Sequence, residues 1–302
     1  MDVRLMKYII KISEERSINQ AAKKLFITQS ALNQQLLKLE EELGVKLFTR
    51  SQRYMLLTEA GEIYVKNARE IIKIRDDTYS RIHDLADKIK GKLSVGLLPE
   101  RGAAIFASIY PQFYSKYPDI KMIPTEQNVK EQLKCIERGD LDIGLVTVRE
   151  QHKEGNQFIH ICKEEFVLVV PRNHPLAPLG APYQSSYPII TLDKFMNDSF
   201  LLIYQGSTMR DVVDEFFARE GFTPNILLES LRCEMLFAIA EQGLGCTIIP
   251  SCYTKDSDQV VYFSLPEPNE WEIAVAYREG SYLTIPEKEL IHLIKAYFLN
   301  QN

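Results

Sequence analysis

The sequence lacks an apolar run long enough to cross a lipid bilayer. A membrane-spanning helix needs roughly 20 consecutive apolar residues, and polar or charged residues interrupt every hydrophobic stretch of this 302-residue chain before that length. The first ten residues, MDVRLMKYII, are charged and carry no small-residue cleavage site of the secretory type. We therefore expect a protein of the cytoplasm, with no membrane partner.

Cysteine is scarce and follows no pattern. The five cysteines form no C-x-x-C pair, and they lie mostly among apolar or small residues. We expect them to be reduced thiols, as in most proteins of a reducing compartment. The five histidines are scattered along the chain, so the sequence predicts no metal site.

Motifs of catalysis and cofactor binding are also missing. There is no Walker phosphate loop, no G-x-S-x-G and no H-E-x-x-H. The segment Gly243-Leu244-Gly245 lacks the third glycine of a dinucleotide-binding loop. An enzyme with a transferase-like cleft would need a nucleophile, an acid–base pair or a metal, and the sequence offers none. We therefore expect a protein that is not an enzyme and has no cofactor.

The charge is divided unevenly along the chain. Residues 1–60 hold 10 Lys and Arg against 7 Asp and Glu, whereas the whole chain has a net charge of −5. The N-terminal part is therefore basic and the remainder acidic. A basic end favours DNA, and an acidic body limits non-specific adhesion to it, although acidic bodies also serve ordinary solubility.

The most informative segment of the sequence runs from residue 17 to residue 57. The tetrad SINQ at 17–20 has the Ser-x-x-Gln form of a capping box and predicts a helix that begins at about Ile18. Ala21 and Ala22 are small enough to let a second helix cross closely. A short break then follows at Ile27.

The second predicted helix begins after Thr28, a natural N-cap residue. Its apolar side chains recur at steps of four, three and four, which predicts a buried stripe made of Leu32, Leu36, Leu39 and Leu43. The opposite face carries short amides and a hydroxyl over its first turns. Side chains of this kind can read base edges in the major groove, and Asn and Gln suit adenine.

The segment 47–56 predicts two short strands around a polar turn, that is, a β-wing. Arg50 and Arg53 would lie on this wing and contact DNA phosphates, although arginines taken alone are ordinary surface charges. A helical hairpin packed in an unrelated core is the alternative, but the caps, the polar face and the wing all favour DNA. The predicted contacts to double-stranded DNA are Thr28, Gln29, Ser30, Asn33, Gln34, Lys38, Arg50 and Arg53.

This segment resembles the DNA-binding domain of the LysR-type transcriptional regulators. The residues that carry the resemblance are Ala21-Ala22, Leu25, Thr28-Gln29-Ser30-Ala31-Leu32, Gln35, Leu39-Glu40, Leu43-Gly44, Leu47-Phe48, Arg50 and Leu57-Thr58-Glu59-Ala60-Gly61. Family members often have basic residues where this chain has Gln34 and Leu37. The resemblance therefore supports the mode of docking on DNA more than any particular base preference.

A long helix is predicted from residue 59 to about Ile89, because no proline interrupts it and no glycine follows Gly61. Residues at alternating steps of four and three form an a/d seam broken only by Arg75 and Thr78. The seam predicts a dimer through Tyr64, Ala68, Ile71, Ile82 and Leu85. Packing against the chain's own domains is the alternative. A charged hinge is expected at 88–92.

Beyond the hinge, strand-like and helical runs alternate, which predicts an α/β architecture. One set of alternating runs covers residues 93–148 and a second covers 166–249. The last strand and helix, 271–277 and 286–299, have no partner in the second set and most simply return to the first. We therefore expect two α/β lobes joined by two crossings near residues 162 and 265.

This topology resembles the effector-binding domain of LysR-type regulators, which is similar to periplasmic solute-binding proteins. The local matches are the segments 139–145, 171–177 and 243–250. The resemblance implies a winged helix-turn-helix domain at 1–58, a linker helix and hinge at 59–91, and an effector domain at 92–302. Within that domain, lobe 1 is expected at about 92–161 and 266–302, and lobe 2 at about 162–265.

The resemblance also implies a homodimer or homotetramer on a palindromic operator, controlled by a small-molecule effector. Two alternatives stay open. Some regulators of this family sense oxidants through a cysteine pair, which makes Cys246 and Cys252 candidates for a redox switch. The second domain could also serve only for assembly and bind no metabolite.

The effector pocket is expected where strand carboxyl ends face the cleft between the lobes. Ser207 and Thr208 open a helix whose N-terminus favours an anion, and Arg101 could add a cation. In the alternative, Ser207 or Thr208 only caps its helix and Arg101 pairs with Glu100 at the surface. The predicted effector contacts are Pro99, Arg101, Thr125, Gln127, Thr147, Gln205, Ser207, Thr208 and Thr247.

Overall fold

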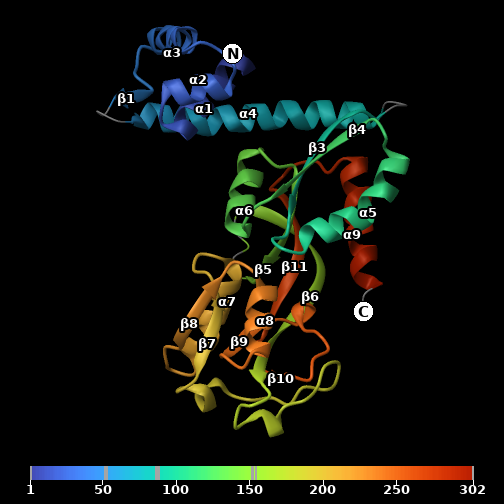
Figure 1. The fold of residues 1–302 in the computed structure, drawn as a ribbon. Helices are drawn as coiled ribbons and strands as arrows, with labels where there is room; N and C mark the ends of the chain where they lie inside the picture. The colour runs from blue at the N-terminus through green and yellow to red at the C-terminus, as the bar shows by residue number, and fades with distance from the viewer. Residues whose placement is uncertain (1, 51–53, 86–88, 151–152, 154, 301–302) are drawn as a thin grey trace. The chain divides into compact units, whose positions relative to one another are not determined.

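The computed structural model describes residues 2–50, 54–85, 89–150, 153 and 155–300. It divides into two compact units, Met1–Asp87 and Lys88–Asn302 (Figure 1). Each unit has a hydrophobic core of its own. The mixed α and α/β character predicted from the sequence is confirmed.

The first unit is built mainly of helices. Its elements are α1 (Val3–Glu15), α2 (Ile18–Lys24), α3 (Gln29–Leu43), β1 (Phe48–Arg50), β2 (Met55–Leu57) and α4 (Glu59–Asp84). The helix α1 adds to the predicted elements, and its Met6, Ile9 and Ile12 recur at steps of three and face the core. The strands β1 and β2 pair antiparallel and form the predicted wing.

Both predicted N-caps are confirmed. Ser17 Oγ accepts the N–H of Gln20 at 3.3 Å, and Thr28 Oγ1 accepts the N–H of Ala31 at 3.2 Å. The helices α2 and α3 therefore begin where the sequence predicts. The buried stripe of α3 stops before Leu43, which is exposed because the helix ends at that residue.

The wing is held against α3 by a buried carboxylate. Glu40 Oε1 accepts the N–H groups of Leu47 and Phe48 at 2.8 and 3.2 Å, and its Oε2 pairs with Lys46 at 2.9 Å. In the first turn of α4, a Cβ at Gly61 would stand 2.1 Å from the Leu47 carbonyl oxygen. The close approach of α4 to the wing therefore requires glycine.

The helix α4 is shorter than predicted. It ends at Asp84, before the expected end at about Ile89. Of the predicted hinge at 88–92, Lys88 lies outside the described residues, and the last two residues belong to the strand β3 (Gly91–Leu97). That strand starts earlier than predicted because it pairs with a neighbouring strand from its first residue.

The second unit alternates strands and helices. Its elements are β3, α5 (Gly102–Lys116), β4 (Ile120–Glu126), α6 (Val129–Arg138), β5 (Ile143–Val148), β6 (Asn156–Pro171), β7 (Ser199–Ile203), α7 (Thr208–Arg219), β8 (Asn225–Ser230), α8 (Cys233–Glu241), β9 (Cys246–Pro250), β10 (Val260–Ser264), β11 (Glu270–Arg278) and α9 (Ile285–Leu299). Short 3-10 helices lie at 177–179, 192–195 and 251–253.

The strands of this unit form one connected sheet in the order β4-β3-β5-β11-β6-β9-β7-β8, with β10 paired to β6. The outer strands pair in parallel through helical crossovers, whereas β6 and β11 run antiparallel to their neighbours. Two lobes with separate cores result. One core is built on β3, β5, α5 and α9, and the other on β7, β9, α7 and α8.

The long strand β6 carries the chain from one lobe into the other (Figure 1). Its residues up to Glu165 pair with β11, those from Phe166 to Val169 pair with β9, and those from Val167 to Pro171 pair with β10 on the other side. The first crossing therefore falls close to residue 162, where the sequence places it, but within one continuous strand. The second crossing lies between β10 and β11. The strand β10 is not among the predicted elements.

Candidate functional site

The exposed face of α3 carries most of the predicted DNA contacts. Thr28, Gln29, Ser30, Gln34 and Lys38 are exposed, and Asn33 is half-buried. The Thr28 hydroxyl caps the helix and lies 3.2 Å from Ser30 Oγ. The first two turns of α3 therefore present short polar side chains beside one another, as reading of base edges in the major groove requires.

The two wing arginines lie at the edge of what the structure describes. Arg50 is the last residue of β1, while Arg53 lies outside the described residues. Tyr54 and Leu56 are exposed on the same hairpin. The position of Arg50 on the wing matches the prediction, and its contact to DNA stays a prediction.

The predicted dimerisation seam of α4 divides into two halves. Ala68 is fully buried within the first unit, and Tyr64 is half-buried against the same core. The first half of α4 packs on α1, where Arg69 pairs with Glu14 at 2.7 Å. Ala68 and Tyr64 are therefore committed to their own chain, and the alternative of internal packing is correct for this half.

The second half of α4 keeps an apolar face exposed. Ile71 is half-buried, whereas Ile74, Ile82 and Leu85 are exposed, Leu85 to 87%. Ile71, Ile82 and Leu85 belong to the predicted seam, whereas Ile74 lies beside it. Exposed apolar residues gathered on one side of a helix are typical of a helix that pairs with another copy.

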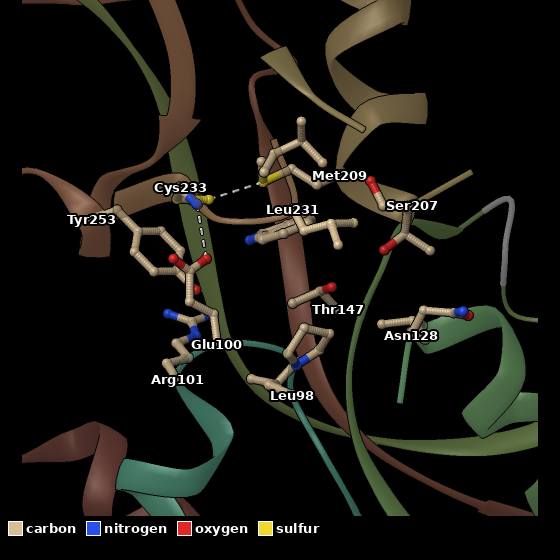
Figure 2. Close-up of a pocket in the computed structure, with 15 residues that line it drawn as sticks. Leu98, Glu100, Arg101, Asn128, Thr147, Ser207, Met209, Leu231, Cys233 and Tyr253 are labelled. Carbon is tan, nitrogen blue, oxygen red and sulfur yellow. Dashed lines mark hydrogen bonds between the residues drawn. The ribbon is translucent and has the colours of Figure 1, made fainter. Parts of the chain in front are cut away.

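A pocket lies between the two lobes of the second unit and holds about 560 Å³ of space including its open mouth. Five of the predicted effector contacts line it: Pro99, Arg101, Thr147, Ser207 and Thr208. Lobe 1 supplies the first three and lobe 2 the other two. Figure 2 shows Arg101, Thr147 and Ser207 around this space, together with side chains that the sequence did not single out.

Four predicted contacts do not line this pocket: Thr125, Gln127, Gln205 and Thr247. Thr247 is fully buried in β9, a central strand, and its hydroxyl has no hydrogen-bond partner within the described structure. Gln127 accepts a bond from Gln132 through its backbone oxygen. The strand-end rule selects the right loops, but it cannot tell which side chain of a loop turns toward the cleft.

Arg101 lines the pocket with its charge already engaged. Its Nη1 and Nη2 donate to the two carboxylate oxygens of Glu164 at 2.7 and 2.8 Å, and Trp271 Nε1 donates to the same carboxylate at 2.7 Å. Burial alone would lower the pKa of Arg101, but the facing Glu164 carboxylate raises it above its ordinary value. The predicted alternative, a surface pair with Glu100, is therefore wrong.

Ser207 serves as the N-cap of α7. Its Oγ accepts the N–H of Arg210 at 3.0 Å and donates to the Tyr204 carbonyl oxygen at 3.3 Å. This is the capping role that the sequence left open as an alternative. The Ser207 hydroxyl is thus satisfied without a ligand, although the residue lines the pocket.

Thr147 and Thr208 differ from Ser207 in this respect. They are only 4% and 8% exposed, and neither hydroxyl has a hydrogen-bond partner among the residues that the structure describes. Both residues line the pocket, one from each lobe, so a ligand held there can form hydrogen bonds with both hydroxyls.

Sequence reasoning missed several groups that complete the pocket. Tyr253, Cys233 and Trp271 come from segments far from the predicted loops, and no motif signals them. Glu100 lies in a predicted loop, yet its role was not foreseen. Its carboxylate accepts backbone N–H groups of α8, at the other side of the cleft.

The two cysteines of the predicted redox alternative are both free thiols. Cys246 is buried, and burial raises its pKa to about 12. Cys252 is exposed as a whole residue, but its Sγ packs beside Arg101, whose Nη1 lies at 2.7 Å, and desolvation of the thiol together with the Glu164 carboxylate raises its pKa. A thiol reacts with oxidants as its thiolate, so both groups are in a form that reacts slowly.

The described residues contain neither a membrane-spanning helix nor a cluster of metal-ligating side chains. No helix there is both long enough and apolar enough to cross a membrane. No group of three or more His, Cys, Asp or Glu side chains there is placed to hold a metal ion.

Proteins named as transcriptional regulators match this chain over nearly the whole length of both chains. The HTH-type transcriptional regulator AlsR of Bacillus subtilis strain 168 is 27% identical, over 97% of this chain and 95% of its own. The DNA-binding transcriptional dual regulator OxyR of Escherichia coli K12 is 26% identical, over 98% of this chain and 95% of its own.

Solved structures show the same fold. A full-length OxyR variant from Pseudomonas aeruginosa has a TM-score of 0.67 at 22% identity and covers 98% of this chain and 94% of its own. Full-length BenM has a TM-score of 0.57 at 21% identity and covers 100% of this chain and 98% of its own.

Two family models match the chain, one on each unit. The model described as "Bacterial regulatory helix-turn-helix protein, lysR family" matches residues 3–62, and the model described as "LysR substrate binding domain" matches residues 86–299. Members of this family are transcriptional regulators that bind DNA and carry an effector-binding domain. Because the two models together span most of its length, this chain belongs to the LysR family.

Proposed function

We propose that this LysR-family protein is a sequence-specific transcriptional regulator whose DNA binding is controlled by a small, oxygen-rich metabolite with an anionic group. The metabolite binds in the pocket between the two lobes of the second unit. The observation that carries this proposal is a pair of largely buried threonines, Thr147 and Thr208, which line the pocket from the two lobes and have no side-chain hydrogen bond to the described residues. Since its target is DNA, we place the protein in the cytoplasm.

The chemistry of the pocket supports an oxygen-rich ligand. Thr147 on β5 and Thr208 at the start of α7 come from different lobes, so one ligand can bond to both. The N-terminus of α7 adds backbone N–H groups and a favourable field for negative charge. Apolar walls, among them Leu98, Met209 and Leu231, surround these polar groups.

Control would follow from the two-lobed architecture. A ligand held by both lobes stabilises one arrangement of the lobes over another, by an amount equal to its difference in affinity for the two. In an oligomer, a change of lobe arrangement can alter the spacing of the DNA-binding domains. The identity of the bound metabolite sets whether target genes respond, and the pocket sets which metabolites fit.

On the DNA side, we propose that α3 reads bases and that the wing and Lys38 contact phosphates. Gln29, Ser30, Asn33 and Gln34 are the candidate base readers. A homodimer or homotetramer held by the second half of α4 would place two or four such helices on a palindromic operator.

Binding to duplexes with matched and scrambled operators at several salt concentrations tests this division. Gln29→Ala should cost the matched operator about 1 to 3 kcal/mol and leave non-specific affinity nearly unchanged. Lys38→Ala should weaken both duplexes alike and reduce the salt slope by about one. Lys66→Ala on α4 is the control lysine. Equal losses of specific and non-specific affinity in Gln29→Ala would contradict the proposed roles.

Native mass spectrometry of gently purified protein, followed by a thermal-shift screen of metabolites, tests the effector. We expect a retained or selected carboxylate-containing metabolite and a dimer or tetramer. If no metabolite bound in either experiment, the alternative of a second domain that only assembles would be favoured. A strictly apolar ligand would contradict the anionic class even if it occupied this pocket.

A further inference from the structure

The N-terminus of α8 is occupied by a carboxylate that belongs to the opposite lobe. Glu100, in the loop after β3 of lobe 1, accepts the N–H of Cys233 at 3.0 Å, as Figure 2 shows. It also accepts the N–H of Glu234 at 3.1 Å. The N-cap residue of α8, Arg232, makes no side-chain cap bond. Glu100 therefore supplies from lobe 1 the acceptor that a helix normally takes from its own N-cap.

The backbone of Glu100 adopts a conformation that is unusual for a residue with a side chain. Its φ is +69°, in the left-handed region that favours glycine. Its own N–H donates to Glu126 Oε1 at 3.2 Å, which helps to hold the loop. Strained residues of this kind persist where the surroundings fix them, and they cluster at ligand sites.

The contact has the geometry of a bound carboxylate anion. Two oxygens of one carboxylate face two successive N–H groups at the positive end of a helix dipole, which is the arrangement in which helix termini bind free anions. The neighbouring cation does not hold Glu100, because Arg101 is committed to both oxygens of Glu164. The helix terminus is thus the partner that Glu100 has in the pocket.

A second observation in the same pocket points to a ligand. Glu100, Thr147 and Thr208 all line it, and the two threonine residues are more than nine-tenths buried and have no side-chain hydrogen bond to the described residues. The carboxylate of Glu100 thus occupies the N-terminus of α8, while the two hydroxyls of the same pocket are not engaged by the described residues. A carboxylate-bearing ligand that reached these hydroxyls would meet Glu100 at α8.

We propose that Glu100 is an intramolecular stand-in for the carboxylate of the effector, a latch between the lobes that the ligand displaces from the N-terminus of α8. The inference rests on the proposed function, because it assumes that the interlobe pocket takes a ligand. The ligand class is then a small carboxylate. When the ligand displaces Glu100, the direct contact between the lobes is lost. A contact from the ligand to both lobes replaces it.

The latch lowers the affinity of the pocket for carboxylates by competing at high effective concentration. The test uses the full-length chain and acetate as the probe, with the amide signals of Cys233 and Glu234 followed by NMR. Glu100→Gln removes the charge and keeps the shape, while Glu100→Gly also relieves the left-handed backbone. Glu241→Gln, at the far end of α8, removes the same charge from the same helix as a control.

We expect acetate to shift both amides with an affinity at least about tenfold higher in the two Glu100 variants than in the parent chain, and within twofold of the parent in Glu241→Gln. Folding is checked by far-UV circular dichroism. Equal acetate affinity in the parent and in either folded Glu100 variant would overturn the latch, as would acetate that shifted other amides but neither of these two.

The outcome separates the latch from the proposed function. A metabolite that binds the pocket of a protein whose Glu100 variants gain no acetate affinity would reject the latch and keep effector control. A gain in acetate affinity, in a protein that binds no metabolite and whose DNA binding does not change, would keep the latch and reject effector control.

Discussion

At the scale of single residues, Glu40 joins the reading helix to the wing. It is buried, and its Oε1 accepts two N–H groups of the wing, from Leu47 and Phe48. Both of these residues are buried as well. Removing the acceptor would leave two buried donors unpaired, which costs about 1 to 3 kcal/mol for each.

Glu40→Ala should therefore open the wing locally. We expect the amides of Leu47 and Phe48 to exchange with solvent at least about tenfold faster than in the parent chain, as measured by hydrogen exchange. Glu40→Gln keeps an acceptor oxygen and should exchange more slowly than the Ala variant. The exposed neighbour Glu41→Ala is the control. Unchanged protection in Glu40→Ala would show that other contacts hold the wing.

Thr147 and Thr247 form a matched pair for testing the pocket. The Thr247 hydroxyl is buried without a partner in the described structure, whereas Thr147, a largely buried residue with no side-chain hydrogen bond to the described residues, lines the pocket. Valine has nearly the same shape as threonine. Replacing either threonine by valine should leave stability unchanged or raise it, because neither replacement removes a hydrogen bond to another described residue.

Ligand affinity should separate the two variants. Thr147→Val should weaken binding of the metabolite found in the screen by about 1 kcal/mol for a neutral partner group, and by up to about 3 kcal/mol for a charged one. Thr247→Val should bind as the parent does, by isothermal titration. Equal affinities in all three proteins would place the ligand away from Thr147.

At the scale of elements, most helices could be predicted because capping residues in the sequence mark where they begin. Thr28 caps α3, Asn128 caps α6 and Thr284 caps α9, and each side chain is seen to accept a backbone N–H. The helix α8 has no side-chain cap at its first turn, and Leu231, two residues before its start, is exposed, so no local signal marks where it begins. Where a cap is absent, periodicity alone leaves the boundary open.

Other features depend on contacts that a local pattern does not contain. The strand β6 crosses both lobes without a turn signal between Glu165 and Phe166, and the sequence predicts only its second half, from residue 166 onward. In the same way, the a/d pattern of α4 cannot show that Ala68 packs inside its own unit. A heptad pattern indicates an apolar face, but not which partner covers each part of it.

The exposed second half of α4 gives a prediction at this scale. Ile82→Glu places a charge on the apolar face and should convert the oligomer to monomers with little operator affinity. Ser80→Glu adds the same charge two residues away, on a different face of the helix, and should leave assembly intact. Analytical ultracentrifugation measures both. The parent oligomer persisting in Ile82→Glu would move the interface elsewhere.

Ala68→Glu separates the two halves of the seam. Because Ala68 is fully buried within the first unit, a glutamate there should unfold that unit and not merely dissociate the oligomer. A folded monomeric Ala68→Glu variant would contradict the internal packing of this half.

At the scale of the whole molecule, the pocket is assembled from both lobes, and this limits what the sequence could reveal. The strand-end rule selected five of its residues, since parallel strands deliver their following loops to one edge. It could not supply Tyr253 or Trp271, which reach the pocket from distant parts of the chain. Nor could it show that Arg101 would be neutralised by Glu164, because that pairing depends on the path of β6 beside β11.

Two ion pairs also cross between the lobes outside the pocket. Lys130 on α6 pairs with Asp211 on α7 at 2.8 Å, and Arg149 after β5 pairs with Glu215 on α7 at 2.6 Å. The first pair is partly exposed and contributes little by itself. Several modest contacts, together with the Glu100 bond, thus hold the lobes, and a ligand can shift their balance by a few kcal/mol.

The division into two units predicts separate thermal transitions. A ligand at about 100 times its Kd stabilises the unit that binds it by about 2.7 kcal/mol, which for a domain of this size raises its midpoint by roughly 2 to 4 °C per kcal/mol. In calorimetry of the full chain, the metabolite should therefore move the transition of the second unit alone. Operator DNA should move the transition of the first unit. A metabolite that raised both transitions equally would show that the two units unfold together. Ligand binding would then stabilise the DNA-binding domain through this shared unfolding, and not through a change in lobe arrangement.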